Sequence, residues 1–187
     1  KKEIIPGTTK QVILKNKFLF LSLLLRHIGA AAVWTILPIM IVEKLGGELY
    51  HISIVYVANT MTAFILMNIM ASKIHLSNVT KFKIGIGCTT FVFVGLSIVT
   101  EGWMAMPFMA LVGATWAFLF IGGNFHLMEN NPRSTSTGIF SSTLSIATVI
   151  GPIIAGTIAF TFDYISVMYF AIVIIVMAFV VSLKIKN

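Results

Sequence analysis

The stretch Thr135–Phe162 reads TSTGIFSSTLSIATVIGPIIAGTIAFTF, 28 residues without a charged side chain. At about 1.5 Å per residue, a helix of this length is long enough to cross a hydrocarbon core of roughly 30 Å. The stretch therefore predicts a helix that spans a lipid bilayer.

Small side chains dominate one face of this expected helix. Residues three and four positions apart share a helical face. Starting from Gly138, this spacing selects Ser142, Ser145, Val149, Pro152, Gly156 and Ala159. A face of small residues lets another helix approach closely, which is a packing feature that any multi-pass protein can have.

A kink is expected at Pro152, because proline has no backbone donor and disturbs the carbonyl group of Thr148. The hydroxyl of Thr148 is placed to relieve that loss. Gly151, next to the proline, would admit a neighbouring helix beside the kink. The residues that we assign to helix packing and bending are Gly138, Ser145, Gly151, Pro152 and Gly156.

The composition excludes a soluble domain. Hydrophobic residues make up 58% of the 187 residues and charged residues 10%, with a mean hydropathy of +0.99, whereas about a quarter of a soluble domain is charged. The formal net charge of +7 does not indicate nucleic-acid binding, because the basic residues lie between apolar runs rather than on one water-facing patch. Cys88, the single cysteine, cannot form an internal disulfide.

Six apolar segments, separated by short polar turns, predict an all-α integral membrane protein with six transmembrane helices. The expected spans cover about 18–42, 50–71, 84–100, 103–125, 135–162 and 165–183. They form one membrane domain, 18–187, behind a polar and basic lead-in, 1–17. The lead-in has no initiating Met and contains a Pro-Gly pair, so we expect the chain to be cut from a longer one. With such short loops, function must lie within the helix bundle.

The distribution of basic residues predicts the orientation, because Lys and Arg in short loops favour the cytoplasmic side. With the N-terminus inside, eleven of them fall on the cytoplasmic side and only Lys44 falls outside. Both termini and the lead-in are therefore expected in the cytoplasm. A division after Thr100 gives two sets of three spans that start on opposite sides, as in an inverted-topology repeat.

Arg26 lies about nine residues into the first span, roughly 13 Å from its inner end. Two interpretations are open: its long side chain snorkels to the membrane surface, or its charge contacts a substrate, an ion or a gate. The neighbouring His27 shares a face with Trp34, two turns away. For His27, a packing role and a role in proton coupling are both open.

Three further residues are expected at similar depths in the bilayer: Trp34 in the first span, Asn59 in the second and Trp116 in the fourth. An amide and two indoles that face a common cavity could hydrogen-bond to an organic substrate and stack on it. Each of them alone could instead serve interhelical packing. Together with Arg26, they are our candidates for substrate binding.

No enzyme signature is present, because the sequence lacks GxSxG, HExxH and Walker motifs and any metal-ligand cluster. We therefore expect no catalytic residue, no metal and no cofactor. No Asp or Glu lies inside an expected span, so the chain offers no acidic proton relay of the kind that pumps use.

The six short-looped spans, with both ends inside, resemble one half of a major facilitator superfamily (MFS) transporter. The element GPIIAG at residues 151–156 is similar to the family's GPxxGG pattern, with Ala155 in place of the first closing glycine. The opening span, with RHIG at 26–29 before Trp34 and Leu37-Pro38, also looks like the first helix of a facilitator half. The resemblance covers nearly the whole chain.

One loop differs from the family's first half. That half carries a GxxxDRxGRR-like signature between its second and third helices, whereas residues 71–78 read ASKIHLSN and lack both the Asp and the glycines. Second halves usually keep only a degenerate copy, and the lead-in resembles the linker that joins the halves. We favour the C-terminal half and leave a divergent N-terminal half open.

The resemblance implies a 3+3 inverted repeat and a secondary transporter in the cell membrane that moves a small organic solute by alternating access. Its partners would be the solute, the lipid bilayer, the other six-helix half and a coupling ion such as H⁺. The first and fourth spans would line a pocket that suits apolar or weakly polar compounds, as in an exporter. The alternatives are the membrane domain of another transporter class and a non-transporting membrane scaffold.

Overall fold

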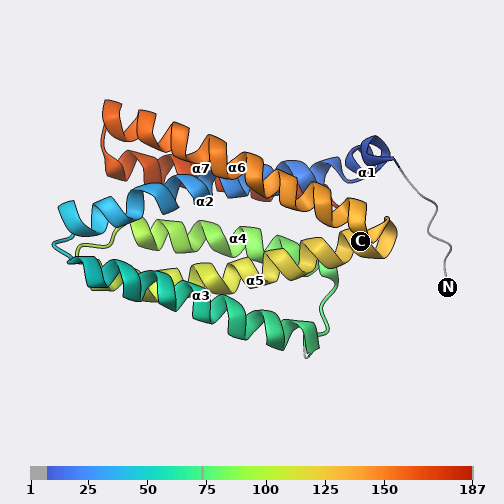
Figure 1. Ribbon diagram of the computed structural model, residues 1–187, viewed down its shortest axis with the longest axis horizontal. Coiled ribbons are helices and arrows are strands. Elements are labelled where there is room, and N and C mark those ends of the chain that lie inside the picture. Colours follow the sequence, from blue (N-terminus) through green and yellow to red (C-terminus); the bar gives the residue numbers. More distant parts are fainter. Residues whose placement is uncertain (1–7, 73, 187) are drawn as a thin grey trace.

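The computed structural model describes residues 8–72 and 74–186, and all regular elements within them are helices (Figure 1). The six long ones are α2 (Lys17–Glu43), α3 (Leu49–Ser72), α4 (Asn78–Ser97), α5 (Ala105–Asn130), α6 (Arg133–Thr161) and α7 (Tyr164–Ser182). Each is long and apolar enough to cross a membrane. The chain is therefore an all-α, multi-pass membrane protein, as its hydropathy predicts.

Two short helices accompany these spans. α1 (Thr9–Lys15) precedes α2, and η1 (Gly102–Met104) precedes α5. α1 begins with a capping box, in which the Thr8 amide donates to Gln11 Oε1 at 2.9 Å and the Gln11 amide donates to Thr8 Oγ1 at 3.4 Å. The first part of the expected lead-in, residues 1–7, lies outside the described residues, as does Lys73.

Helices extend beyond two of the apolar runs that predict them. α4 begins at Asn78 rather than at about residue 84, because Ser77 Oγ caps it by accepting from the Thr80 amide at 3.1 Å. Residues 131–132 alone separate α5 from α6, so most of the polar loop expected at 126–134 is helical. Once a helix is nucleated, each added residue gains a backbone hydrogen bond whether or not its side chain is apolar.

The six long helices form two layers (Figure 1). α2 packs against α6 and α7, and α5 packs against α3 and α4. Contacts of α4 with α7 and of α5 with α6 join the layers. The chain leaves the first layer after α2, builds the second with α3, α4 and α5, and returns for α6 and α7.

Close helix contacts are made at glycines. Gly113 on α5 faces α3 so closely that a Cβ there would collide with the carbonyl oxygen of Asn59. A Cβ at Gly151 on α6 would stand 2.6 Å from Ala31 Cβ on α2. Such contacts matter in a bilayer, because helix association there depends on van der Waals packing. The turn after α2 needs a glycine for another reason, since Gly46 has a φ of 60°.

Candidate functional site

Arg26 on α2 lies in the interior of the bundle, and its side chain is only 2% exposed. Its Nη2 donates to Thr89 Oγ1 on α4 at 3.4 Å, which is long for a hydrogen bond. The guanidinium carbon lies 5.4 Å from the centre of the Trp116 ring on α5, within reach of a cation–π interaction. The Nε atom is buried without a hydrogen-bond partner. The guanidinium is therefore enclosed by three helices and only weakly bonded.

Among the described residues, no acidic side chain balances this charge. The acidic residues of the whole chain are Glu3, Glu43, Glu48, Glu101, Glu129 and Asp163. The five that the structure describes lie in turns or at helix ends, far along the chain from the middle of a span. A guanidinium stays charged in proteins, and burying a charge costs several kcal/mol even after the structure relaxes. The bundle thus holds a positive charge that its own described residues do not neutralise.

An aromatic series runs beside Arg26 from α2 to α6. The ring centres are 5.4 Å apart for His27 and Trp116, 5.4 Å for Trp116 and Phe120, and 5.6 Å for Phe120 and Phe140. The Nδ1 atom of His27 is buried and has no hydrogen-bond partner. Arg26 and His27, which are consecutive on α2, therefore each place a nitrogen without a hydrogen-bond partner next to the indole of Trp116.

A groove of about 330 Å³ opens beside His27, between α2 and α6. It is lined by His27, Ala31, Trp34, Thr35, Thr148 and Pro152. Its volume lies within the range of small-molecule sites, about 300–1,000 Å³. The hydroxyls of Thr35 and Thr148 donate to the carbonyls of Ala31 and Ser145 at 2.9 and 2.8 Å. The Thr148 hydroxyl therefore bonds to the Ser145 carbonyl. It does not compensate the Thr148 carbonyl that Pro152 disturbs, contrary to what the sequence led us to expect.

Trp34 joins this groove to α3. Its ring packs edge-on against Tyr56, with ring centres 4.7 Å apart, and the Tyr56 hydroxyl donates to the Trp34 carbonyl at 2.8 Å. His27 is next to both candidate indoles, because it lines the groove together with Trp34 and its ring contacts that of Trp116. The structure therefore brings Arg26, Trp34 and Trp116 into one neighbourhood.

Asn59 is used elsewhere in the bundle. Its side chain is 7% exposed, and its Nδ2 donates to the Met109 carbonyl at 3.0 Å. Met109 lies two turns before Trp116 on α5. The Asn59 amide therefore joins α3 to α5 near Met109 rather than beside Arg26.

The small face of α6 is turned outward. Gly138, Ser145 and Gly156 are exposed, and no atom of another described helix lies within 4 Å of where a Cβ of either glycine would stand. The buried face consists of Ser136, Phe140, Thr143, Ala147, Gly151 and Ala155. Among the expected packing residues, Gly151 meets α2 and Pro152 lines the groove.

Thr89, Tyr56 and Phe120 also belong to this neighbourhood, but the sequence does not single them out. Thr89 stands in an apolar run beside a second threonine, and depth alone does not tell which of the two faces α2. Phe120 follows Trp116 by four residues, and this spacing on one helix face is the signal that could have identified it.

The arrangement combines a guanidinium, an imidazole and two indoles with an apolar groove. Of these groups, the imidazole of His27 and the indole of Trp34 line the groove, where they can hydrogen-bond to a solute and stack on it, whereas Arg26 and Trp116 are not among its lining residues. Within residues 8–72 and 74–186, no group of three or more His, Cys, Asp or Glu side chains is placed to hold a metal ion. Comparisons with models of protein families, with curated proteins and with solved structures find no match for this chain.

Proposed function

We propose that this chain is one six-helix half, the C-terminal one, of a secondary transporter of the major facilitator superfamily. The complete transporter moves a small organic solute across the cell membrane by alternating access, coupled to an ion such as H⁺. In this half, α2 and α5 supply the wall of the solute path where Arg26, His27 and Trp116 meet.

The observation that carries the proposal is the buried guanidinium of Arg26 without a counter-charge. Charged residues inside a membrane bundle are expensive, and they mark substrate or ion pathways. An arginine that snorkelled would place its head group in water, but the Arg26 side chain is only 2% exposed. The unpartnered Arg26 Nε and His27 Nδ1 offer hydrogen bonds that a solute would complete.

The helix packing supports an inverted repeat. If α2, α3 and α4 correspond to α5, α6 and α7, then the α3–α5 contact corresponds to the α2–α6 contact. Likewise, the α4–α5 contact corresponds to the α2–α7 contact, and the α4–α7 contact corresponds to itself. Exchanging the two sets of three leaves the main packing pattern unchanged, as a pseudo-two-fold axis in the membrane plane requires.

The least buried helices support a second six-helix half as the partner. α3 and α6, which correspond in the repeat, are the least buried of the six spans. On α6, the exposed positions include Gly138, Ser145 and Gly156, where a helix from another bundle could approach closely. Lipid would cover the remaining outer surface.

The distribution of charge supports cytoplasmic termini. Lys15, Lys184 and Lys186 line one pocket, so the start of α2 and the end of α7 share a basic end of the bundle. At the other end, Glu43 accepts a hydrogen bond from the Tyr164 hydroxyl at 2.7 Å, next to Asp163. The positive-inside rule assigns the basic end to the cytoplasm.

The proposal is tested by solute flux in proteoliposomes that contain the natural polypeptide to which this chain belongs. A panel of small organic solutes is screened by thermal shift, and the flux of each hit is then measured. We expect Trp116→Ala to lower that flux about tenfold, through lost stacking and positioning. Trp103→Ala removes an indole that is 58% exposed and is expected to change nothing.

Three results would contradict the proposal. Equal flux in the two tryptophan variants would remove the α2–α5 wall from the solute path. Flux that requires nucleotide hydrolysis would indicate the membrane domain of another transporter class. The absence of flux for every solute that binds would indicate a membrane scaffold.

A further inference from the structure

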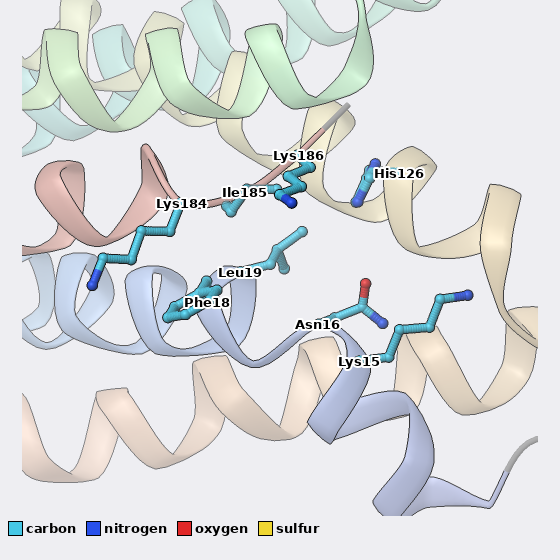
Figure 2. Close-up of a pocket in the computed structure, with 8 residues that line it drawn as sticks. All are labelled: Lys15, Asn16, Phe18, Leu19, His126, Lys184, Ile185 and Lys186. Atoms are coloured by element: carbon cyan, nitrogen blue, oxygen red, sulfur yellow. The ribbon is translucent and has the colours of Figure 1, made fainter.

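A second pocket lies at the basic end of the bundle, where the α1–α2 junction meets the residues after α7 (Figure 2). Its volume is about 420 Å³, and the basic residues that line it are Lys15, His126, Lys184 and Lys186. Figure 2 shows Lys186 and His126 near one another on one side of the pocket, while the side chains of Lys15 and Lys184 extend away from them in opposite directions. These residues come from three separate parts of the sequence, near residues 15, 126 and 185, so the fold gathers them.

The charged side chains that line this pocket are all basic. No acidic residue is among the described residues that line it. Glu129, one turn beyond His126 on α5, does not line the pocket, but it remains a nearby negative charge that acts on His126; its Oε1 accepts from Asn78 Nδ2 at 2.6 Å. The positive-inside rule explains why lysines lie at this end, but it does not require them to surround a hollow. Three lysines around one hollow create a positive potential that attracts an anion.

Hydrogen bonds fix the backbone that carries these lysines. At the α1–α2 junction, Asn16 Nδ2 donates to the Val12 carbonyl at 2.9 Å. After α7, the Ile185 carbonyl accepts from Lys83 Nζ at 2.9 Å, which ties the segment between Lys184 and Lys186 to α4. The amines can therefore adjust to a ligand on their flexible stems while the backbone stays in place.

The floor of the pocket is apolar. The amines of Lys17 and Lys184 lie over the Phe18 ring, 5.2 and 5.6 Å from its centre. Ile185 is 8% exposed and belongs to the core, whereas Leu21, one turn beyond Phe18, is 44% exposed. A ligand could thus place a charged group among the amines and an apolar chain along α2 toward the membrane.

We infer that this pocket binds a phosphate group. A phosphate monoester carries a charge of about −1.5 to −2 and three acceptor oxygens, so it matches several amines at once better than a single carboxylate does. Two sources share this chemistry, the monoester head group of phosphatidic acid and a soluble phosphate monoester. Basic pockets at the cytoplasmic ends of transmembrane helices bind lipid head groups, and the apolar floor beside the amines suits a lipid. This inference does not depend on the proposed transport function.

The test measures ligand binding to the full chain in detergent by native mass spectrometry. The probes are dioctanoyl phosphatidic acid, the zwitterionic dioctanoyl phosphatidylcholine, and inorganic phosphate as a competitor. The triple variant Lys15→Gln, Lys184→Gln, Lys186→Gln removes the pocket's lysine charges. The matched control Lys10→Gln, Lys44→Gln, Arg133→Gln removes the same charge at exposed positions that do not line the pocket.

We expect phosphatidic acid to bind more tightly than phosphatidylcholine. The triple variant of the pocket lysines should weaken the binding of phosphatidic acid on the order of tenfold or more. The control triple should leave the affinity unchanged. Displacement by inorganic phosphate would identify a soluble phosphorylated ligand, whereas resistance to it would identify the lipid, and both support the inference. Equal binding of the two lipids, or equal effects of the two triples, would overturn it. Lys186→Gln alone, at an exposed site, gives the same answer if the triple fails to fold.

Discussion

The guanidinium of Arg26 lies over the indole of Trp116, with its carbon 5.4 Å from the ring centre. The negative face of an indole attracts a cation by about 2 kcal/mol in a desolvated site. Burial of the guanidinium charge costs several kcal/mol, so the contact with Trp116 offsets only part of that cost. Within the part of the chain that the structure describes, Arg26 is therefore a destabilising residue, and this has measurable consequences.

We expect Arg26→Met to stabilise the protein and to impair its function. Methionine fills a comparable interior space, and replacing poorly compensated buried charge by apolar side chains stabilises proteins by up to about 4 kcal/mol. Thermal unfolding in detergent and solute flux in proteoliposomes measure the two effects. Arg26→Lys is the control, because it keeps a charge but loses the planar group that stacks on Trp116.

The Arg26 variants separate a functional arginine from a structural one. A large drop in melting temperature for Arg26→Met, with normal flux in the surviving protein, would show that the guanidinium serves the fold. Arg26→Lys should not share the gain in stability, since the buried charge remains.

A second prediction concerns the close contact between α3 and α5. Gly113→Ala should destabilise the bundle by about 1–3 kcal/mol, because the added Cβ would collide with the Asn59 carbonyl oxygen. Gly138→Ala is the matched control at an open position of α6. It should be neutral or stabilise by up to about 1 kcal/mol, because alanine favours the helix. Chemical denaturation of the two variants measures the difference, and equal stabilities would contradict the contact.

The six helices could be predicted because apolar runs of about 20 residues have few alternatives to a membrane span. Their ends could not be placed equally well. Residues 78–83 are mostly polar or basic, yet they form the first turns of α4 behind the cap at Ser77. Hydropathy measures the apolar run, whereas capping and backbone bonding decide where the helix begins.

The rotation of each helix about its axis was the harder problem. In a soluble helix the apolar stripe marks the buried face, but lipid is as apolar as leucine, so a membrane helix need not show one. The type and depth of Arg26 and Trp116 made them candidates, yet their contact with each other and with Thr89 depends on rotation. For the same reason, Asn59 faces Met109, and Gly138 faces outward.

Asp163 predicts a pH dependence at the end of the bundle opposite the basic pocket. Its Oδ1 accepts from the Ser166 amide at 2.6 Å and caps α7. Hydrogen bonds from the Ser166 side chain and amide hold the pKa of this carboxyl below its usual value. A pKa lowered by folding means that the carboxylate stabilises the protein above its unfolded pKa, and that this stability is lost as the pH falls through the folded pKa.

The melting temperature should therefore fall as the pH drops below about 5 and on through the lowered pKa of Asp163, and it should fall less for Asp163→Asn. Asparagine is as good a cap as aspartate but does not titrate in this range. The comparison isolates Asp163 from the other carboxyl groups, which are the same in both proteins. Parallel losses in the two proteins would mean that Asp163 contributes nothing to the pH dependence.

Gly156→Leu tests whether the outward face of α6 has a partner in the transporter that we propose. A Cβ at Gly156 would meet no atom of another described helix within 4 Å, so leucine should leave the free energy of unfolding of this bundle unchanged or raise it by up to about 1 kcal/mol, because leucine favours a helix more than glycine does. If a second bundle packs on this face, the leucine side chain blocks its approach, and flux falls while the protein still inserts into the membrane. Gly151→Leu is the contrasting variant, since its Cβ would stand 2.8 Å from the Ile28 carbonyl oxygen and should disrupt α2–α6 packing itself. Normal flux in Gly156→Leu would rule out a packing role for this face in the transport cycle.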